Sequence, residues 1–180
     1  ITKRLIGCLF APTKIYLFSF ICSKGNIINL YKQDYLNTEY LGFYSKDSLS
    51  PIKHLKIRQA INYGFDREKM LKFLRNNIGS PAINGFIPKG MPSFSEDVIG
   101  FNYNKEKSKQ LINEVKEMNN GILSPIILST NASYLDLCEY IQNELGKNGL
   151  EIEINVNPPS THRQMVATSK LSFFRASWIA

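Results

Sequence analysis

The sequence predicts an α/β fold in which a mixed sheet carries flanking helices. The strongest indication starts at Ser124, where "PIILST" and "LEIEINVN" have strand character and enclose the helical stretch "ASYLDLCEYIQNELGKNG", which should end at Gly149. A strand, a helix and a second strand in this order form a βαβ unit, so the two strands should be parallel and joined by a right-handed connection. The second strand alternates apolar and polar residues, which indicates that one of its faces is partly exposed.

The region before this unit predicts one strand and two helices. Residues 35–44 are rich in aromatic residues and have extended character. Residues 52–65 predict a helix that stops at Gly64, and Asp66 can cap a second helix over residues 67–77. Apolar residues recur at helical spacing and should form the buried stripes of these two helices: Leu55, Ile57, Ala60, Ile61, Phe65, Met70, Leu71 and Leu74.

A long loop and three further elements complete the predicted order. Residues 78–100 contain too many glycines and prolines for regular structure, and ordered loops of this length are often functional. Asn104 should cap a helix over residues 105–118. A further helix over residues 158–170 should be capped by Ser160 or Thr161, and residues 171–179 should form a last, mostly apolar strand.

Residues 1–34 form an apolar segment, and the sequence leaves open whether it is a buried helix, a strand, or a segment that is not native to the fold. Pro12 and Lys14 interrupt it, and neither part reaches the roughly 20 apolar residues of a membrane span. "LIGC" at residues 5–8 looks like a bacterial lipoprotein cleavage box, but only seven residues precede Cys8 and they contain no apolar core. We therefore treat residues 1–34 as separate from the domain that follows.

Composition does not favour a nucleic-acid-binding protein. The 180 residues carry a net charge of +7, from 22 lysines and arginines against 15 acidic residues. The basic residues are scattered and alternate with acids, and no basic stripe is interleaved with aromatic residues. We therefore expect a globular protein that has no nucleic-acid partner.

Enzyme and metal motifs are missing from the sequence. It contains no phosphate-binding glycine loop, no nucleophile elbow and no zinc-protease motif. Asp66 and Glu68 are paired carboxylates, but their place at a helix start indicates capping. No metal-ligand spacing connects the cysteines and histidines, which are Cys8, Cys22, Cys138, His54 and His162. The sequence thus predicts no catalytic residue, no metal site and no cofactor.

Polar and aromatic residues gather instead at the ends of two predicted strands: Asn37, Thr38, Tyr40 and Tyr44 in one, Arg175 and Trp178 in the other. Flat aromatic faces with a few hydrogen-bonding groups suit a cleft for an extended ligand. Alternation along the last strand directs Phe174, Ala176 and Trp178 to one face and Arg175 to the other. The alternative is that the aromatic residues fill the core: Tyr40, Phe43, Phe173 and Phe174.

Five stretches of the chain, in order, carry a resemblance to a known family: "NTEYLGF", "LKIRQAINYGFDREKML", "SPAINGFIPKGM", "FNYNKEKSKQLINE" and "FFRASWIA". From about Tyr35 to Ala180 the sequence resembles the extracytoplasmic solute-binding proteins of peptide ABC importers, the oligopeptide and dipeptide type of family 5. Two residues depart from the family pattern, since Lys105 replaces a proline and Tyr44 stands where asparagine is frequent. Residues 1 to about 30 do not match the family well.

This resemblance implies a fold, partners and a site. Residues 35–180 would be part of the C-terminal lobe of a two-lobed periplasmic-binding-protein-like fold, and the chain would be a fragment that lacks the second lobe, since the family motif continues into an aspartate. The ligand would be a peptide, delivered to a membrane permease from the periplasm or another extracytoplasmic location, with or without a lipid anchor. Arg175 and Trp178 would line the cleft, with Asn37, Thr38 and Tyr40 on its opposite side.

Other functions stay open at this point. Within the same class, the solute could be a nickel chelate, an opine or an oligosaccharide. From other classes, the rivals are a basic nucleic-acid-binding module and a small enzyme. Salt-sensitive binding would indicate the former, and turnover without a partner would indicate the latter.

Overall fold

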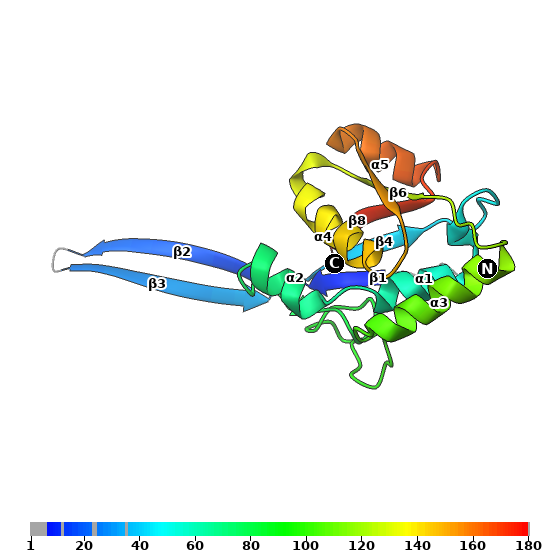
Figure 1. The fold of residues 1–180 in the computed structure, drawn as a ribbon. Helices are drawn as coiled ribbons and strands as arrows, with labels where there is room; N and C mark the ends of the chain where they lie inside the picture. Colours follow the sequence, from blue (N-terminus) through cyan, green and yellow to red (C-terminus); the bar gives the residue numbers. More distant parts are fainter. Residues whose placement is uncertain (1–6, 12, 23–24, 35, 180) are drawn as a thin grey trace.

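The computed structural model describes residues 7–11, 13–22, 25–34 and 36–179. Six strands form one sheet in the order β5-β1-β4-β8-β6-β7 (Figure 1), and their bounds are β1 Gly7–Ala11, β4 Asn37–Phe43, β5 Ser80–Pro81, β6 Ile126–Thr130, β7 Ile152–Val156 and β8 Phe173–Ile179. β6 runs parallel to β7 and to β8, whereas β4 is antiparallel to β1 and β8. The predicted mixed sheet is confirmed.

The βαβ unit forms as predicted, with α4 (Leu135–Gly146) joining the parallel strands β6 and β7. The helix ends three residues earlier than expected, because the chain turns after Gly146 and reaches Gly149 with a φ of 88°. β7 lies at the edge of the sheet. Ile152 at the start of this strand is buried, whereas Val156 at its other end is exposed.

Three further predicted helices are present on one side of the sheet: α1 (Leu55–Tyr63), α2 (Arg67–Leu74) and α3 (Lys105–Met118). The Asp66 side chain accepts a hydrogen bond from the Lys69 N–H at 3.0 Å, and Asn104 caps α3 in the same way through Lys107 at 2.9 Å. The prediction of a buried stripe is wrong for one residue. Leu55 is 51% exposed, since it begins α1 and faces away from the core.

The fifth helix, α5 (Pro159–Ala167), is also where predicted, but its cap is not. Neither Ser160 nor Thr161 caps it, and Pro158 holds the N-cap position without a side-chain hydrogen bond. Pro159 occupies the first helical position, where proline suits the backbone and lacks only an N–H that would be unpaired anyway. Ser160 and Thr161 therefore lie within the first turn of the helix and do not precede it.

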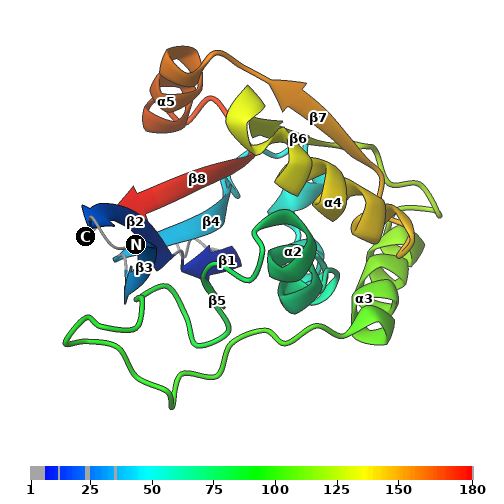
Figure 2. The same cartoon turned by 90° about the vertical axis from the view of Figure 1, so that its left-hand side faces the viewer.

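The core lies between the sheet and helices α1–α4. Its apolar side chains include Leu41, Phe43 and Phe173 from the central strands, and the rings of Phe43 and Phe173 stack with centroids 5.1 Å apart. Asn148, which follows α4, donates to the Gly64 carbonyl at 3.0 Å and so ties this end of α4 to the turn after α1. Figure 2 shows α5 apart from the group formed by α1–α4.

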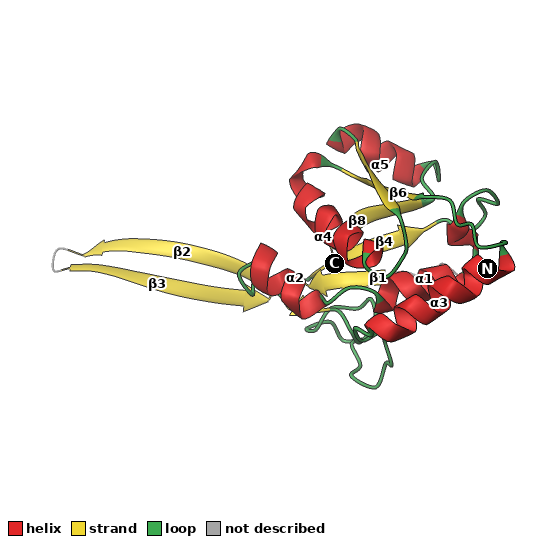
Figure 3. Cartoon of the chain, in the orientation of Figure 1, coloured by secondary structure: helices red, strands yellow, loops and turns green. Residues whose placement is uncertain are grey.

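The long loop predicted over residues 78–100 is present and is interrupted only by the two residues of β5 (Figure 3). About half of its residues are exposed, whereas Pro88 is buried and Phe86 is half-buried. Gly85 and Gly90 adopt φ values of 98° and 104°, a region that favours glycine. The loop therefore has a defined course that brings Phe86 onto the sheet.

The described parts of residues 1–34 form strands, which is one of the structures that the sequence left open. β1 joins the sheet beside β4, and β2 (Thr13–Cys22) pairs with β3 (Gly25–Asp34) in a hairpin that projects from the body of the protein (Figure 1). Half of the "LIGC" box, residues 5 and 6, lies outside the described residues. No helix in the described part of the chain is long and apolar enough to cross a membrane.

Gly42 offers a test of the β4–β8 packing. The Phe174 ring lies over this glycine, so the added methyl group of Gly42→Ala would overlap the ring. We expect this substitution to lower the free energy of unfolding by about 1 to 3 kcal/mol, as overpacking does. Gly146→Ala is the matched control, because nothing lies within 4 Å of the added atom. Equal urea midpoints for the two variants would contradict the packing described here.

Candidate functional site

The pairing of β4 with β8 brings the predicted site residues together. Thr38 lies opposite Trp178, and Asn37 lies opposite Ile179. The residues expected on opposite sides of a cleft are thus on neighbouring strands, which corrects that part of the expectation. Because directly paired residues share a face of the sheet, Thr38, Tyr40 and Trp178 occupy one face, and Asn37 and Arg175 occupy the face toward the core.

An aromatic cluster covers the first of these faces and consists of Tyr40, Phe86 and Trp178. The Phe86 ring lies 5.3 Å from the Tyr40 ring in an edge arrangement and 5.6 Å from the Trp178 ring, measured between centroids. Thr38 Oγ1 donates to the Phe86 carbonyl at 3.0 Å and fixes the loop there. Trp178 remains 37% exposed, so a large part of its indole can contact a ligand.

Sequence reasoning missed Phe86. The available signal was the loop itself, which was expected to be functional but offered no residue periodicity that could locate one side chain. The contact depends on a hydrogen bond between residues 48 positions apart. Such a contact can be seen only in the folded chain.

A buried charge pair lies on the opposite face. Arg175 forms an ion pair with Glu39, and each side chain is only 4% exposed. Asn37 donates to Glu39 Oε1 at 3.2 Å, and the Tyr134 ring centroid lies 3.0 Å from the Arg175 guanidinium carbon. Burial lowers the pKa of Arg175 to about 9, so the guanidinium stays charged at neutral pH. Glu39, which sequence reasoning did not single out, neutralises Arg175.

A cavity of about 360 Å³, hereafter the α5 pocket, opens between α5 and β8. Its walls include Tyr40, Asn131, Tyr134, His162, Arg163 and Arg175. His162 is buried and holds α5 to the sheet, since its Nε2 lies 2.8 Å from the Arg175 carbonyl oxygen. The α5 pocket therefore lies beside the aromatic cluster and shares Tyr40 with it.

The topology of the sheet explains why a pocket opens here. The chain passes from β6 through α4 outward to β7, and then back through α5 across β6 to β8. Connections between parallel strands are almost always right-handed, and these two run in opposite directions across the sheet. α4 and α5 therefore cover opposite faces of the sheet. β6 pairs with β8 at Ser129 and Phe174 and ends at Thr130, whereas β8 continues to Ile179, so most of β8 extends past the carboxyl end of β6, where open α/β sheets bind their ligands.

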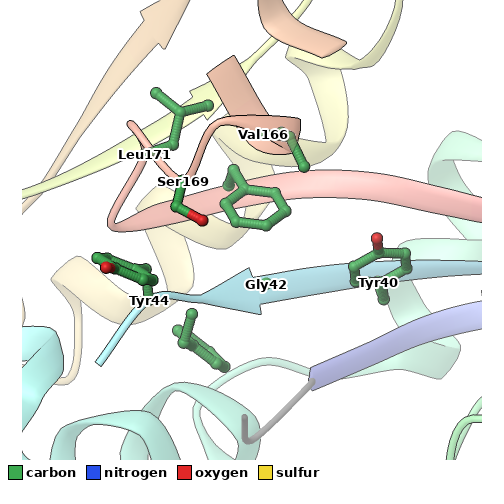
Figure 4. Close-up of a pocket in the computed structure, with 8 residues that line it drawn as sticks. Tyr40, Gly42, Tyr44, Val166, Ser169 and Leu171 are labelled. Carbon is green, nitrogen blue, oxygen red and sulfur yellow. The ribbon is translucent and has the colours of Figure 1, made fainter. Parts of the chain in front are cut away.

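A second, smaller cavity of about 90 Å³ continues along the same face of β4 (Figure 4). Tyr40 and Tyr44 lie at its two ends, and Gly42 between them provides no side chain. Val166 and Ser169 cover it from the end of α5 and the turn that follows. Tyr40 and Val166 line both cavities, so the two cavities are neighbours beneath α5.

The titratable and nucleophilic side chains of the described residues have identifiable surroundings. No group of three or more histidine, cysteine, aspartate or glutamate side chains in the described part of the chain could hold a metal ion. Burial raises the pKa of the Cys138 thiol to about 11, which leaves it protonated and unreactive at neutral pH. Asp66 caps α2, as the capping interpretation of the paired carboxylates predicted.

Comparison with known families decides the class of protein. The sequence model of the bacterial extracellular solute-binding proteins, family 5 Middle, matches residues 17–180. The chain belongs to this family. The match begins within β2, so the family region extends further toward the amino terminus than the resemblance from Tyr35 and includes half of the segment that we had set apart.

Known relatives are binding proteins. The chain is 27% identical to heme-binding protein A of Haemophilus influenzae over 128 residues, and 28% identical to the dipeptide-binding protein of Escherichia coli over 132 residues. These alignments cover 69% and 71% of this chain but only 23% and 24% of the relatives, so the chain spans about a quarter of their length.

A solved structure supports the fold assignment. The chain superimposes on peptide-bound OppA of Listeria monocytogenes with a TM-score of 0.70 at 18% identity, covering 80% of this chain and 31% of that one. At this level of identity the similarity shows a shared fold. The flanked mixed sheet of this chain is thus the architecture of a solute-binding protein.

The buried pair of Arg175 and Glu39 yields a stability prediction. Glu39→Gln leaves the guanidinium buried without its counter-charge, so we expect a loss of about 3 to 5 kcal/mol in the free energy of unfolding. Glu96→Gln is the matched control, because the pair of Glu96 with Lys89 is about three-quarters exposed; we expect its effect to stay below about 1 kcal/mol. Similar urea midpoints for the two variants would show that the buried pair does not contribute as described.

Proposed function

We propose that this chain contributes the C-terminal-lobe wall of a cleft that binds extended peptides for delivery to the membrane permease of an ABC importer. Residues 35–180 supply part of that lobe, and a second lobe of the same protein closes over the ligand. The protein works outside the cytoplasm, in the periplasm or tethered to the envelope by a lipid. No bond is made or broken in this function.

The observation that carries the proposal is the unpaired edge of β8 beside an exposed tryptophan. Beyond Phe174, β8 has no strand partner on its outer edge among the described residues. The Arg175 carbonyl faces that edge, where it meets His162. Because backbone groups alternate along a strand, the N–H and C=O of Ser177 face the same edge. An extended peptide can hydrogen-bond to such an edge as an added strand.

The aromatic cluster supports the same ligand class. Trp178 presents a rigid apolar face with few rotatable bonds, so contact with a ligand side chain costs little conformational entropy. Hydrogen bonds to the ligand backbone do not depend on side-chain identity, whereas the aromatic surface tolerates many apolar shapes. Together they suit a protein that accepts peptides of varied sequence.

A second candidate ligand is a flat non-peptide solute. One relative is named a heme-binding protein, and the exposed indole of Trp178 offers a flat surface on which a ring could stack. The free edge of β8 favours the peptide, because a planar ring system offers no row of alternating donors and acceptors. Titration with heme and with mixed short peptides separates the two, and tight binding of heme alone would overturn the peptide proposal.

Trp178→Ala tests the proposed contact. In the full-length protein we expect a loss of about 1 to 3 kcal/mol in peptide binding, which corresponds to roughly a 5- to 150-fold weaker Kd. The melting temperature of the ligand-free protein should change little, because the indole is 37% exposed. Phe73→Ala is the control, since Phe73 is an exposed aromatic residue on α2 that lies outside the cluster.

Calorimetric titration and thermal unfolding should be measured on the same two variants. A large drop in melting temperature with unchanged affinity for Trp178→Ala would mean that Trp178 is a core residue. An equal loss of affinity for Phe73→Ala would mean that the effect is not specific to the cluster.

A further inference from the structure

We propose that the α5 pocket receives a ligand side chain that carries a carboxylate, and that Arg163 is the residue that determines this specificity. The inference rests on the peptide-binding function proposed above and adds a preference for acidic peptides. It follows from the balance of charges around the pocket, from its size, and from a buried donor nitrogen of Arg175 in its wall.

The charge around the α5 pocket is positive. Arg163 and Arg175 both line it, and no aspartate or glutamate is among its described lining residues. Glu39 neutralises Arg175, whereas Arg163 forms no ion pair with any described residue and is exposed. One uncompensated guanidinium therefore remains at the pocket, and guanidinium groups bind carboxylates through paired, charge-assisted hydrogen bonds.

The start of α5 adds to this bias. Pro159 lines the pocket, and no side chain caps the helix that begins there. The unpaired N–H groups at a helix start carry partial positive charge, which favours an anion nearby. Arg163 is on the first turns of the same helix, so both contributions act on the same side of the pocket.

The wall of the pocket also contains a hydrogen-bond donor without a partner. Arg175 Nε is buried and has no hydrogen-bond partner among the described residues. The Arg175 side chain is more than nine-tenths buried and lines the pocket. A buried N–H without an acceptor costs free energy, so a ligand carboxylate that enters here and is met by a small adjustment of Arg175 gains more than an apolar group.

The volume fits one side chain better than a whole ligand. At about 360 Å³ the α5 pocket lies near the lower end of the range of roughly 300 to 1,000 Å³ typical of pockets that enclose small molecules. It opens beside Ser177, whose backbone faces the free edge of β8. A peptide held along that edge would therefore direct one of its side chains into the pocket while its backbone remains on β8.

The test uses pairs of tripeptides that differ only in glutamate against glutamine, with the substituted position moved through all three residues. Calorimetric titration of the full-length protein should show at one position a preference for glutamate of about tenfold, the size expected for a hydrogen bond to a charged group. Arg163→Gln should reduce this ratio to less than about twofold, because the charge contact that distinguishes glutamate from glutamine is lost.

Lys170→Gln is the matched control, since Lys170 is an exposed cation near α5 that does not line the pocket. It should retain the full preference for glutamate. An unchanged ratio in Arg163→Gln, or equal affinity for both peptides in the unmodified protein, would overturn the specificity proposal while peptide binding itself stands. Absence of binding to every peptide would instead overturn the proposed function, and with it this inference.

Discussion

The antiparallel register between β4 and β8 is the constraint on which the rest of the site depends. It runs from Asn37 with Ile179 to Phe43 with Phe173 without a break. Side chains alternate between the two faces of a strand, so this register alone assigns Trp178 and Tyr40 to the open face and Arg175 and Glu39 to the core side. A slip of β8 by one residue would turn Trp178 toward the core and Arg175 toward the open face, away from Glu39.

The buried ion pair is well suited to oppose such a slip. Burying two charges is costly, and the attraction between Arg175 and Glu39 offsets that cost only when the partners meet. Asn37 and the Tyr134 ring complete the surroundings of the pair. In the shifted register Glu39 would remain buried without its partner, so the pair favours one register more than it adds to overall stability. We regard this specificity role as a hypothesis that the Glu39→Gln variant can examine.

The sequence was informative where local patterns decide the structure. Helical spacing and capping residues placed α1, α2 and α3, and strand alternation placed Trp178 and Arg175 on opposite faces of β8. It was uninformative where partners are distant in the chain. Glu39 and Phe86 could not be recognised, because one acquires its role from Arg175 and the other from a loop that returns to the sheet. The expected cap of α5 failed because two consecutive prolines set the helix start before Ser160.

The site also depends on where the sheet stops being continuous. β6 ends at Thr130, one residue after its pair with Phe174, whereas β8 continues to Ile179. Among the described residues, the outer edge of β8 therefore has no strand partner beyond Phe174. His162 on α5 meets the Arg175 carbonyl at this edge, and the α5 pocket opens beside it. The free edge of β8 and the α5 pocket therefore have a common origin in the short length of β6, and the proposed recognition of a peptide backbone and of one side chain depends on both.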